Sequence, residues 1–195
     1  MRIDYDAAQS LRDVRARYFR DNGFGEDGGY AKAWVPVQLG PVTVGFPNTA
    51  ARVRAVKFHD LHHVVTGYGT DAVGEAEIGA WEAGSGCGGF VAAWVLNAYA
   101  TAIGYLAGKP GALWAAFVRG RQTHNLYQTP FDDALLDARL GEVRARLGLD
   151  AAAAPASLGD RLAFAAWTAS SLVLALATIA APIAGLAWLG HKLLS

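Results

Sequence analysis

A long uncharged stretch near the C-terminus restricts how this chain can fold. Leu162 to Gly190 contains no Asp, Glu, Lys or Arg, a run of 29 residues. About 20 helical residues cross the hydrocarbon layer of a bilayer, so this run is long enough to span it even when tilted. Trp167 and Trp188 lie near its two ends, where the two membrane interfaces favour aromatic side chains. The sequence therefore predicts a C-terminal transmembrane anchor rather than a buried helix of a soluble domain.

Composition divides the chain into a charged part and an uncharged part. Hydrophobic residues make up 53% of the chain and charged residues 17%, and most of the charges precede the uncharged run. We expect a domain over residues 1–150, an Ala-rich linker over 151–160 and the anchor over 161–195. The formal net charge is +0, which speaks against a nucleic-acid partner because such a partner requires a basic patch.

The expected location follows from the two ends of the chain. Residues 1–6 contain acidic side chains and no apolar run, so no export signal is expected. A single cysteine excludes an internal disulfide and fits a reducing compartment. These features predict a single-pass membrane protein whose N-terminal domain is cytoplasmic, although the charges that flank the anchor are too balanced to fix its orientation.

A cluster of His and acidic residues indicates a metal site in the domain. We expect a helix from Arg52 to Thr66, begun by Asn48 or Thr49 and ended by Gly67. On that helix His59 and His63 are four residues apart, so their imidazoles lie one turn apart on one face, with Asp60 beside them. His62 points elsewhere and is not expected to be a ligand.

A second expected helix, from Asp71 to Ala83, supplies further carboxylates. It can bring Glu75 against the first helix, and Glu82 lies two turns further along the same face. Two imidazoles with one or two carboxylates suit a divalent metal, zinc first and otherwise iron, manganese or magnesium. Because this ligand set is incomplete, it leaves room for water or substrate, which indicates chemistry rather than a purely structural ion.

The rest of the domain is predicted to be helical. Residues 30–46 form either a hairpin around Gly40-Pro41 or an extended lead-in to the motif helix. The apolar segment 90–107 is borderline as a membrane span, and we favour a helix in the domain core or along an isoprenoid groove. Further helices are expected over 7–21, 112–122 and 132–147. The predicted fold class is therefore all-α, a helical domain followed by a single C-terminal transmembrane helix.

The metal motif resembles the signature of a known family. His59-Asp60-x-x-His63, eleven residues and then Glu75 are similar to the HDxxH-x11-E signature of the Coq4 family of ubiquinone biosynthesis proteins, and Glu82 stands where that family carries another acidic residue. The resemblance covers roughly residues 10–150. From the motif spacing we expect His59, His63 and Glu75 to hold a divalent metal, with Asp60 either a fourth ligand or an orienting group, and Glu82 to be a catalytic residue that moves a proton.

The resemblance also implies a substrate and a reaction. The substrate would be a benzene ring bearing a long polyprenyl tail, and the reaction the loss of the ring carboxylate with hydroxylation at the same carbon. A different class of function stays open, namely a non-catalytic subunit that binds a quinone or isoprenoid lipid and assists a respiratory or photosynthetic membrane complex or other quinone-pathway proteins. An unrelated metal-dependent lipid hydrolase fits the ligands but lacks a recognisable nucleophile motif.

Overall fold

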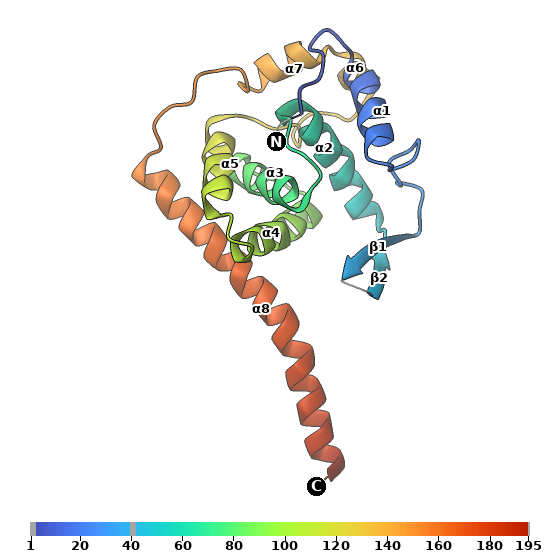
Figure 1. Ribbon diagram of the computed structural model, residues 1–195, viewed down its shortest axis with the longest axis vertical. Coiled ribbons are helices and arrows are strands. Elements are labelled where there is room, and N and C mark those ends of the chain that lie inside the picture. The colour runs from blue at the N-terminus through green and yellow to red at the C-terminus, as the bar shows by residue number, and fades with distance from the viewer. Residues whose placement is uncertain (1–2, 40–41, 195) are drawn as a thin grey trace.

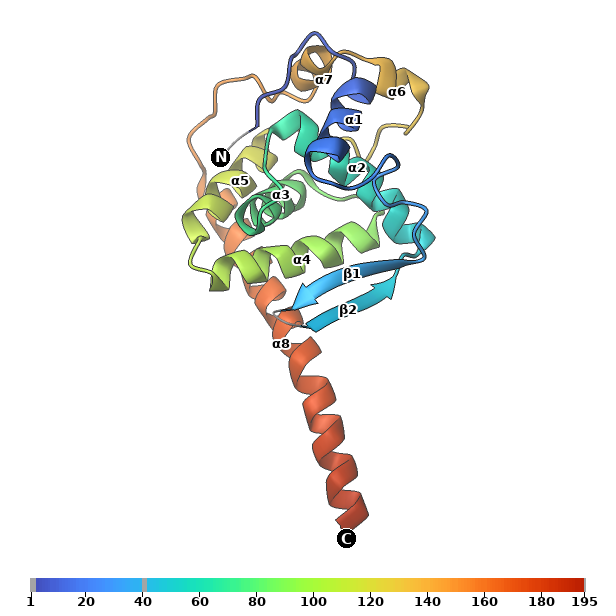
Figure 2. The same ribbon diagram turned by 45° about the vertical axis from the view of Figure 1, so that its right-hand side comes forward.

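The computed structural model describes residues 3–39 and 42–194, which form a mostly helical domain followed by one long apolar helix (Figures 1 and 2). The described helices are α1 (Leu11–Asp21), α2 (Ala50–Thr66), α3 (Ala72–Ser85), α4 (Val91–Leu106), α5 (Pro110–Gln122), α6 (Asp133–Asp137), α7 (Leu140–Arg146) and α8 (Leu158–Leu194). Two strands, β1 (Trp34–Leu39) and β2 (Val42–Pro47), form the described sheet. The predicted helical fold class is confirmed.

The segment before the metal motif is a β-hairpin, which decides between the two expected alternatives. The strands pair antiparallel in a register that runs from Trp34 opposite Pro47 to Leu39 opposite Val42. The predicted turn residues, Gly40 and Pro41, lie outside the described residues.

The two motif helices begin and end where local chemistry directs them. The Thr49 side chain accepts a hydrogen bond from the Arg52 amide at the start of α2, and Gly67 ends this helix with φ 77°. Such a left-handed conformation favours glycine because it has no Cβ. At the start of α3 the Asp71 carboxylate accepts the Gly74 amide at 2.7 Å. Both predicted helices are thereby confirmed, with ends within about two residues of those expected.

Helix α3 is the centre of the domain core, and it packs against both α4 and α5. Trp81 and Ile78 on α3 are fully buried together with Leu61 of α2 and Leu113 of α5. The backbones of α3 and α5 approach closely where Gly120 faces the Trp81 carbonyl. This close packing holds α3, and with it Glu75 and Glu82, in a fixed position beside α2.

We expect Gly120→Ala to destabilise the domain. A Cβ at this position would lie 2.2 Å from the Trp81 carbonyl oxygen, so the helices would have to separate. Overpacking of this kind costs about 1–3 kcal/mol, measurable as a lower thermal unfolding midpoint in detergent. Gly111→Ala is the matched control, since its Cβ would meet nothing within 4 Å and lies on the same helix. Equal midpoints for the two variants would contradict the close approach of α3 and α5.

The prediction of a single helix over residues 132–147 is wrong, because this segment forms two short helices, α6 and α7. At the break, backbone groups of residues 132–147 pair with the N-terminal segment instead of with each other. The Leu11 amide donates to the Ala138 carbonyl, and the Leu140 amide donates to the Gln9 carbonyl. The same pairing explains why α1 begins at Leu11 rather than at residue 7. Leu135, Leu136, Leu140 and Val143 are still buried, so the predicted apolar face is retained in two pieces.

Helix α8 packs along α4 and then extends away from the domain (Figures 1 and 2). The Trp167 indole donates to the Thr101 hydroxyl at 3.0 Å and its ring lies 5.6 Å from that of Trp94. The helix begins at Leu158, so the last part of the expected linker is helical. The stretch Leu158–Thr178 is long and apolar enough to cross a membrane, and only 11% of it is buried against the domain.

Candidate metal centre

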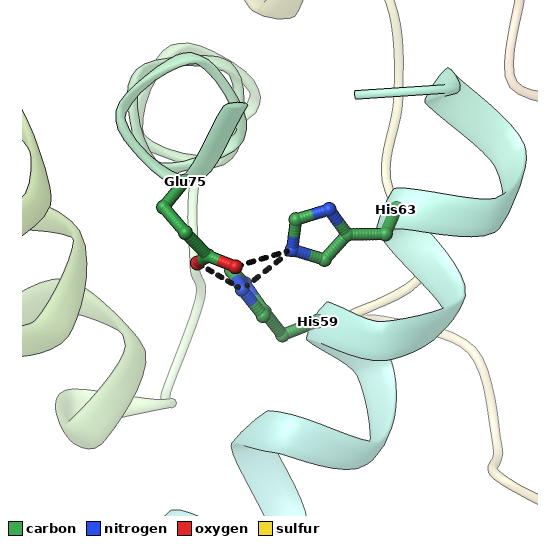
Figure 3. A group of neighbouring side chains, drawn as sticks. All are labelled: His59, His63 and Glu75. Carbon is green, nitrogen blue, oxygen red and sulfur yellow. Dashed lines mark hydrogen bonds and ion pairs between the residues drawn. The ribbon is translucent and has the colours of Figure 1, made fainter. Parts of the chain in front are cut away.

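Three side chains on α2 and α3 form a compact group of metal-binding type (Figure 3). His59 and His63 project from successive turns of α2, and Glu75 points toward both of them from the first turn of α3. One ligand atom from each lies within 4.8 Å of the others. The Glu75 oxygens lie 3.4 Å from the Nε2 atoms of both histidines. This arrangement could hold a metal ion, as the spacing in the sequence predicts.

Hydrogen bonds behind the two imidazoles fix which nitrogen of each ring faces the group. The Nδ1 atom of His63 lies 3.0 Å from the Tyr68 carbonyl oxygen, which can only accept, so this nitrogen carries the proton. The Nδ1 atom of His59 lies 2.9 Å from a Glu82 oxygen and donates to it. Both Nε2 atoms therefore present lone pairs, and they are 3.1 Å apart. Two lone pairs so close require a cation between them, either a proton or a metal ion.

The electrostatics of the group agree with this requirement. Burial alone lowers the pKa of His59, but the carboxylates of Glu82 and Glu75 outweigh it and raise this pKa well above its ordinary value. Burial acts to raise the pKa of Glu75, yet the neighbouring His59 and His63 hold it far below its usual range. The group without metal therefore contains an ionised Glu75 and a protonated His59 at neutral pH.

Glu82 is fully buried behind His59, and four donors occupy its two carboxylate oxygens. His59 and His62 contact one oxygen at 2.9 and 2.6 Å, whereas Asn97 and Tyr127 donate to the other at 2.7 and 2.8 Å. Burial acts to raise the pKa of Glu82, but its histidine partners lower it well below the ordinary value. This geometry fits an ionised carboxylate that orients His59, whereas the proton transfer expected of Glu82 stays a prediction.

Three of these partners were not identified from the sequence as parts of the site. His62 lies outside the group of three ligands, as expected, but it donates to Glu82 and accepts the Leu126 amide at 3.0 Å through its other ring nitrogen. Asn97 and Tyr127 complete the set. Asn97 carried a usable signal, since an amide within the apolar segment 90–107 needs a buried hydrogen-bond partner.

Asp60 lies beside the metal group but does not belong to it. The Tyr30 hydroxyl donates to its carboxylate at 2.5 Å. Burial raises the pKa of Asp60, and this hydrogen bond opposes the rise. Asp60 was expected to be either a fourth ligand or an orienting group. Its contact with Tyr30 holds this carboxylate in place at the wall of the site, outside the group of three ligands.

Two members of the metal group, His59 and Glu75, lie in the wall of a cavity of about 480 Å³. Its polar wall includes His59, Asp60, Glu75 and Glu82, and part of its apolar wall comes from α4. The hairpin and the loop that follows α1 supply other walls, through residues that include Trp34, Val35, Pro36 and Phe24. Such a volume is typical of sites for organic ligands, so a substrate can lie next to the metal group.

Metal binding should release about one proton per ion at neutral pH. Because the pKa of His59 is raised, this imidazole is protonated before metal binds and must lose its proton, whereas the pKa of Glu75 is lowered and this carboxylate has none to lose. The apparent affinity should therefore increase with pH until the pH exceeds the pKa of His59. Calorimetric titration with metal in buffers of different protonation enthalpy measures this number. A count of zero would contradict the proposed proton between the two rings.

Comparison of the chain with family models, with curated proteins and with solved structures finds no match. Function is therefore inferred from the site and from the resemblance of its motif.

Proposed function

We propose that this protein is a membrane-anchored, Coq4-like protein of ubiquinone biosynthesis that acts on a polyprenylated benzoate ring at a divalent metal. The observation that supports this proposal most is the group of His59, His63 and Glu75, of which His59 and Glu75 line a largely apolar cavity. The HDxxH-x11-E pattern supports the same proposal. In this proposal α8 crosses the membrane and the domain lies on the cytoplasmic side.

The cavity suits an aromatic ring with an isoprenoid substituent. Its polar residues gather at one wall, around His59 and Glu75, whereas Ala93, Leu96 and Ala100 of α4 line another. A ring can therefore lie at the metal group while its prenyl tail follows the apolar side.

Arg52 supplies a cation for the ring carboxylate. It lies two turns before His59 on α2 and lines the same cavity. One of its terminal nitrogens donates to the Asn48 side chain at 2.8 Å. Its buried Nε has no hydrogen-bond partner among the described residues, and burial lowers the pKa of the guanidinium. A buried donor without a partner gains free energy by binding an anion, so we assign the substrate carboxylate to Arg52.

The proposed reaction replaces the carboxylate of the ring by a hydroxyl group. The carboxyl carbon leaves as CO2 and the ring carbon gains a hydroxyl oxygen from water, so the ring loses two electrons. O2 takes up these electrons and two protons and leaves as hydrogen peroxide. A bound metal would polarise the carboxylate and phenolate oxygens of the ring. Two imidazoles and one carboxylate with further positions open occur in both zinc and iron enzymes, and the need for oxidation favours iron or manganese over redox-inert zinc.

The test is turnover by the full chain in phospholipid vesicles. We expect it to release labelled CO2 from a prenylated hydroxybenzoate labelled at the carboxyl carbon, in the presence of O2 and added metal. The His63→Ala/Glu75→Ala variant should release none. Normal turnover in that variant would overturn the metal-centred proposal. Metal binding without turnover, with mature quinone bound to the purified protein, would favour the non-catalytic accessory subunit instead.

In the same assay Arg52→Gln should mainly raise KM. Loss of a hydrogen bond to a charged group costs about 1.5–3 kcal/mol, or roughly 10- to 100-fold in KM, with a smaller effect on kcat. Arg54→Gln, two residues away on the exposed side of α2, is the matched control and should leave KM unchanged. An unchanged KM in Arg52→Gln would remove Arg52 from substrate recognition.

A further inference from the structure

Exposed apolar side chains gather at one end of the domain. Within the described residues, every large hydrophobic side chain that is exposed belongs to β1, α4 or α8. On α4, Val91 and Leu106 are 72% and 73% exposed. The hairpin and α4 lie at the end of the domain toward which α8 extends, as both views in Figures 1 and 2 show. We call this surface of β1, β2 and α4 the apolar end.

Charge is distributed in the opposite way. The hairpin residues 34–47, helix α4 and residues 162–190 of α8 contain no Asp, Glu, Lys or Arg. At the far end of the domain, α1 and α6 are joined by exposed ion pairs from Arg12 to Asp133 and Asp137, at 2.7 and 2.8 Å. The domain is therefore polarised along the direction of α8, and its charged end points away from the side on which α8 leaves.

Exposed residues of α4 form a stripe at helical spacing. Val91, Val95 and Ile103 are exposed on one side of the helix, with the half-buried Tyr99 between the last two, and Leu106 lies on the same side. The stripe borders α8, because the Tyr99 and Thr178 hydroxyls form a hydrogen bond at 2.6 Å. This hydrogen bond fixes the level of the stripe along α8.

Helix length then places the stripe relative to a bilayer. From Thr178 to the end of the uncharged run at Gly190 the helix rises only about 18 Å, less than the roughly 30 Å of hydrocarbon. The most C-terminal 20-residue span within the uncharged run, residues 171–190, begins about 10 Å before Thr178. Therefore, wherever α8 crosses the membrane within that run, Tyr99 lies at or below the surface of the hydrocarbon layer on the side of the domain.

We propose that the apolar end of the domain is embedded in the surface of the same bilayer that α8 crosses. The occupant of the stripe is lipid, because the adjoining α8 is already within the hydrocarbon at the level of the stripe. Amphipathic helices at membrane surfaces bury their apolar side about 5–10 Å deep, which agrees with the depth set by Thr178. This inference rests on α8 spanning the membrane, as stated in the proposed function.

The embedded surface gives the cavity direct access to membrane lipids. Trp34, Val35 and Pro36 of the hairpin and Ala93, Leu96 and Ala100 of α4 line the cavity that contains the metal group. The elements that meet the bilayer are thus also walls of the site. A prenylated substrate can enter between them without leaving the hydrocarbon, whereas a water-soluble substrate would approach through the charged side.

Nitroxide labels on the full chain in phosphatidylcholine–phosphatidylglycerol vesicles test this placement. Single cysteines replace Val91 and Leu106 on the stripe, Ala180 on α8 and Ala16 on α1, all of them exposed. The native Cys87 is fully buried, and the unchanged protein serves as the labelling blank. Power-saturation EPR then compares the accessibility of each label to O2, which enters hydrocarbon, with its accessibility to a water-soluble nickel chelate.

We expect labels at Val91→Cys, Leu106→Cys and Ala180→Cys to be more accessible to O2 than to nickel, and Ala16→Cys to show the reverse. If the two stripe labels are as accessible to nickel as Ala16→Cys while Ala180→Cys is in lipid, the apolar end is not embedded, although α8 still crosses the membrane. An Ala180→Cys label that is open to nickel would overturn both. Low accessibility of the stripe labels to both reagents would show a protein covering the stripe and would also overturn the proposal. None of these outcomes depends on turnover.

Discussion

The His59→Ala/His63→Ala variant is expected to contain no divalent metal after purification in mild detergent, whereas the unchanged protein retains close to stoichiometric metal. Both Nε2 lone pairs face Glu75, and their removal leaves a single carboxylate, which cannot hold an ion against water. Metal analysis by mass spectrometry of the purified proteins measures the difference.

The matched control is His124→Ala, because His124 is exposed and lies outside the metal group. It should retain metal at the level of the unchanged protein. Circular dichroism separates loss of ligands from loss of fold, and we expect helical spectra from both variants. Full metal content in His59→Ala/His63→Ala would show that the metal is bound elsewhere than at the two histidines of α2.

Replacing Glu82 by Gln should weaken both the fold and the metal centre. The new amide nitrogen would face two buried donors in place of an acceptor oxygen, which costs about 3 kcal/mol of the free energy of unfolding. Loss of the carboxylate behind His59 also reduces metal affinity by about 10- to 100-fold, as for other groups that orient metal-binding histidines. Denaturant titration in detergent and calorimetric metal titration measure the two effects.

Glu142→Gln is the control for Glu82→Gln, because it makes the same chemical change at an exposed position on α7. It should alter neither quantity. A Glu82→Gln protein with unchanged stability and metal affinity would show that the four hydrogen bonds do not hold His59. If turnover alone were lost while stability and metal affinity stayed normal, Glu82 would instead act in proton transfer.

The metal helices could be predicted because their signals are local. Thr49 begins α2, Gly67 ends it and Asp71 begins α3, and each acts through its own backbone neighbourhood. The spacing of His59 and His63 then requires no knowledge of the rest of the fold. The long helix α8 could be predicted equally well, because the length of the apolar run and its lack of charge are sufficient to expect a helix there.

Other features depend on contacts between distant segments and could not be predicted. The break between α6 and α7 arises where the Ala138 carbonyl pairs with Leu11 near the start of the chain. The role of His62 depends on the Leu126 amide, 64 residues away. The stripe on α4 could be read as a core helix or a membrane span, and only its contact with Thr178 of α8 indicates a third arrangement.

Analysis of metal and of bound lipid in the same native preparation tests whether α2 and α3 form a metal centre that acts on a prenylated ring. Protein purified in mild detergent is compared with His59→Ala/His63→Ala by metal analysis and by mass spectrometry of extracted lipid. We expect near-stoichiometric metal together with a carboxylated prenylphenol in the unchanged protein, and loss of the metal in the variant. Unchanged protein that binds no metal, even when metal is supplied, would show that His59, His63 and Glu75 are not a metal centre.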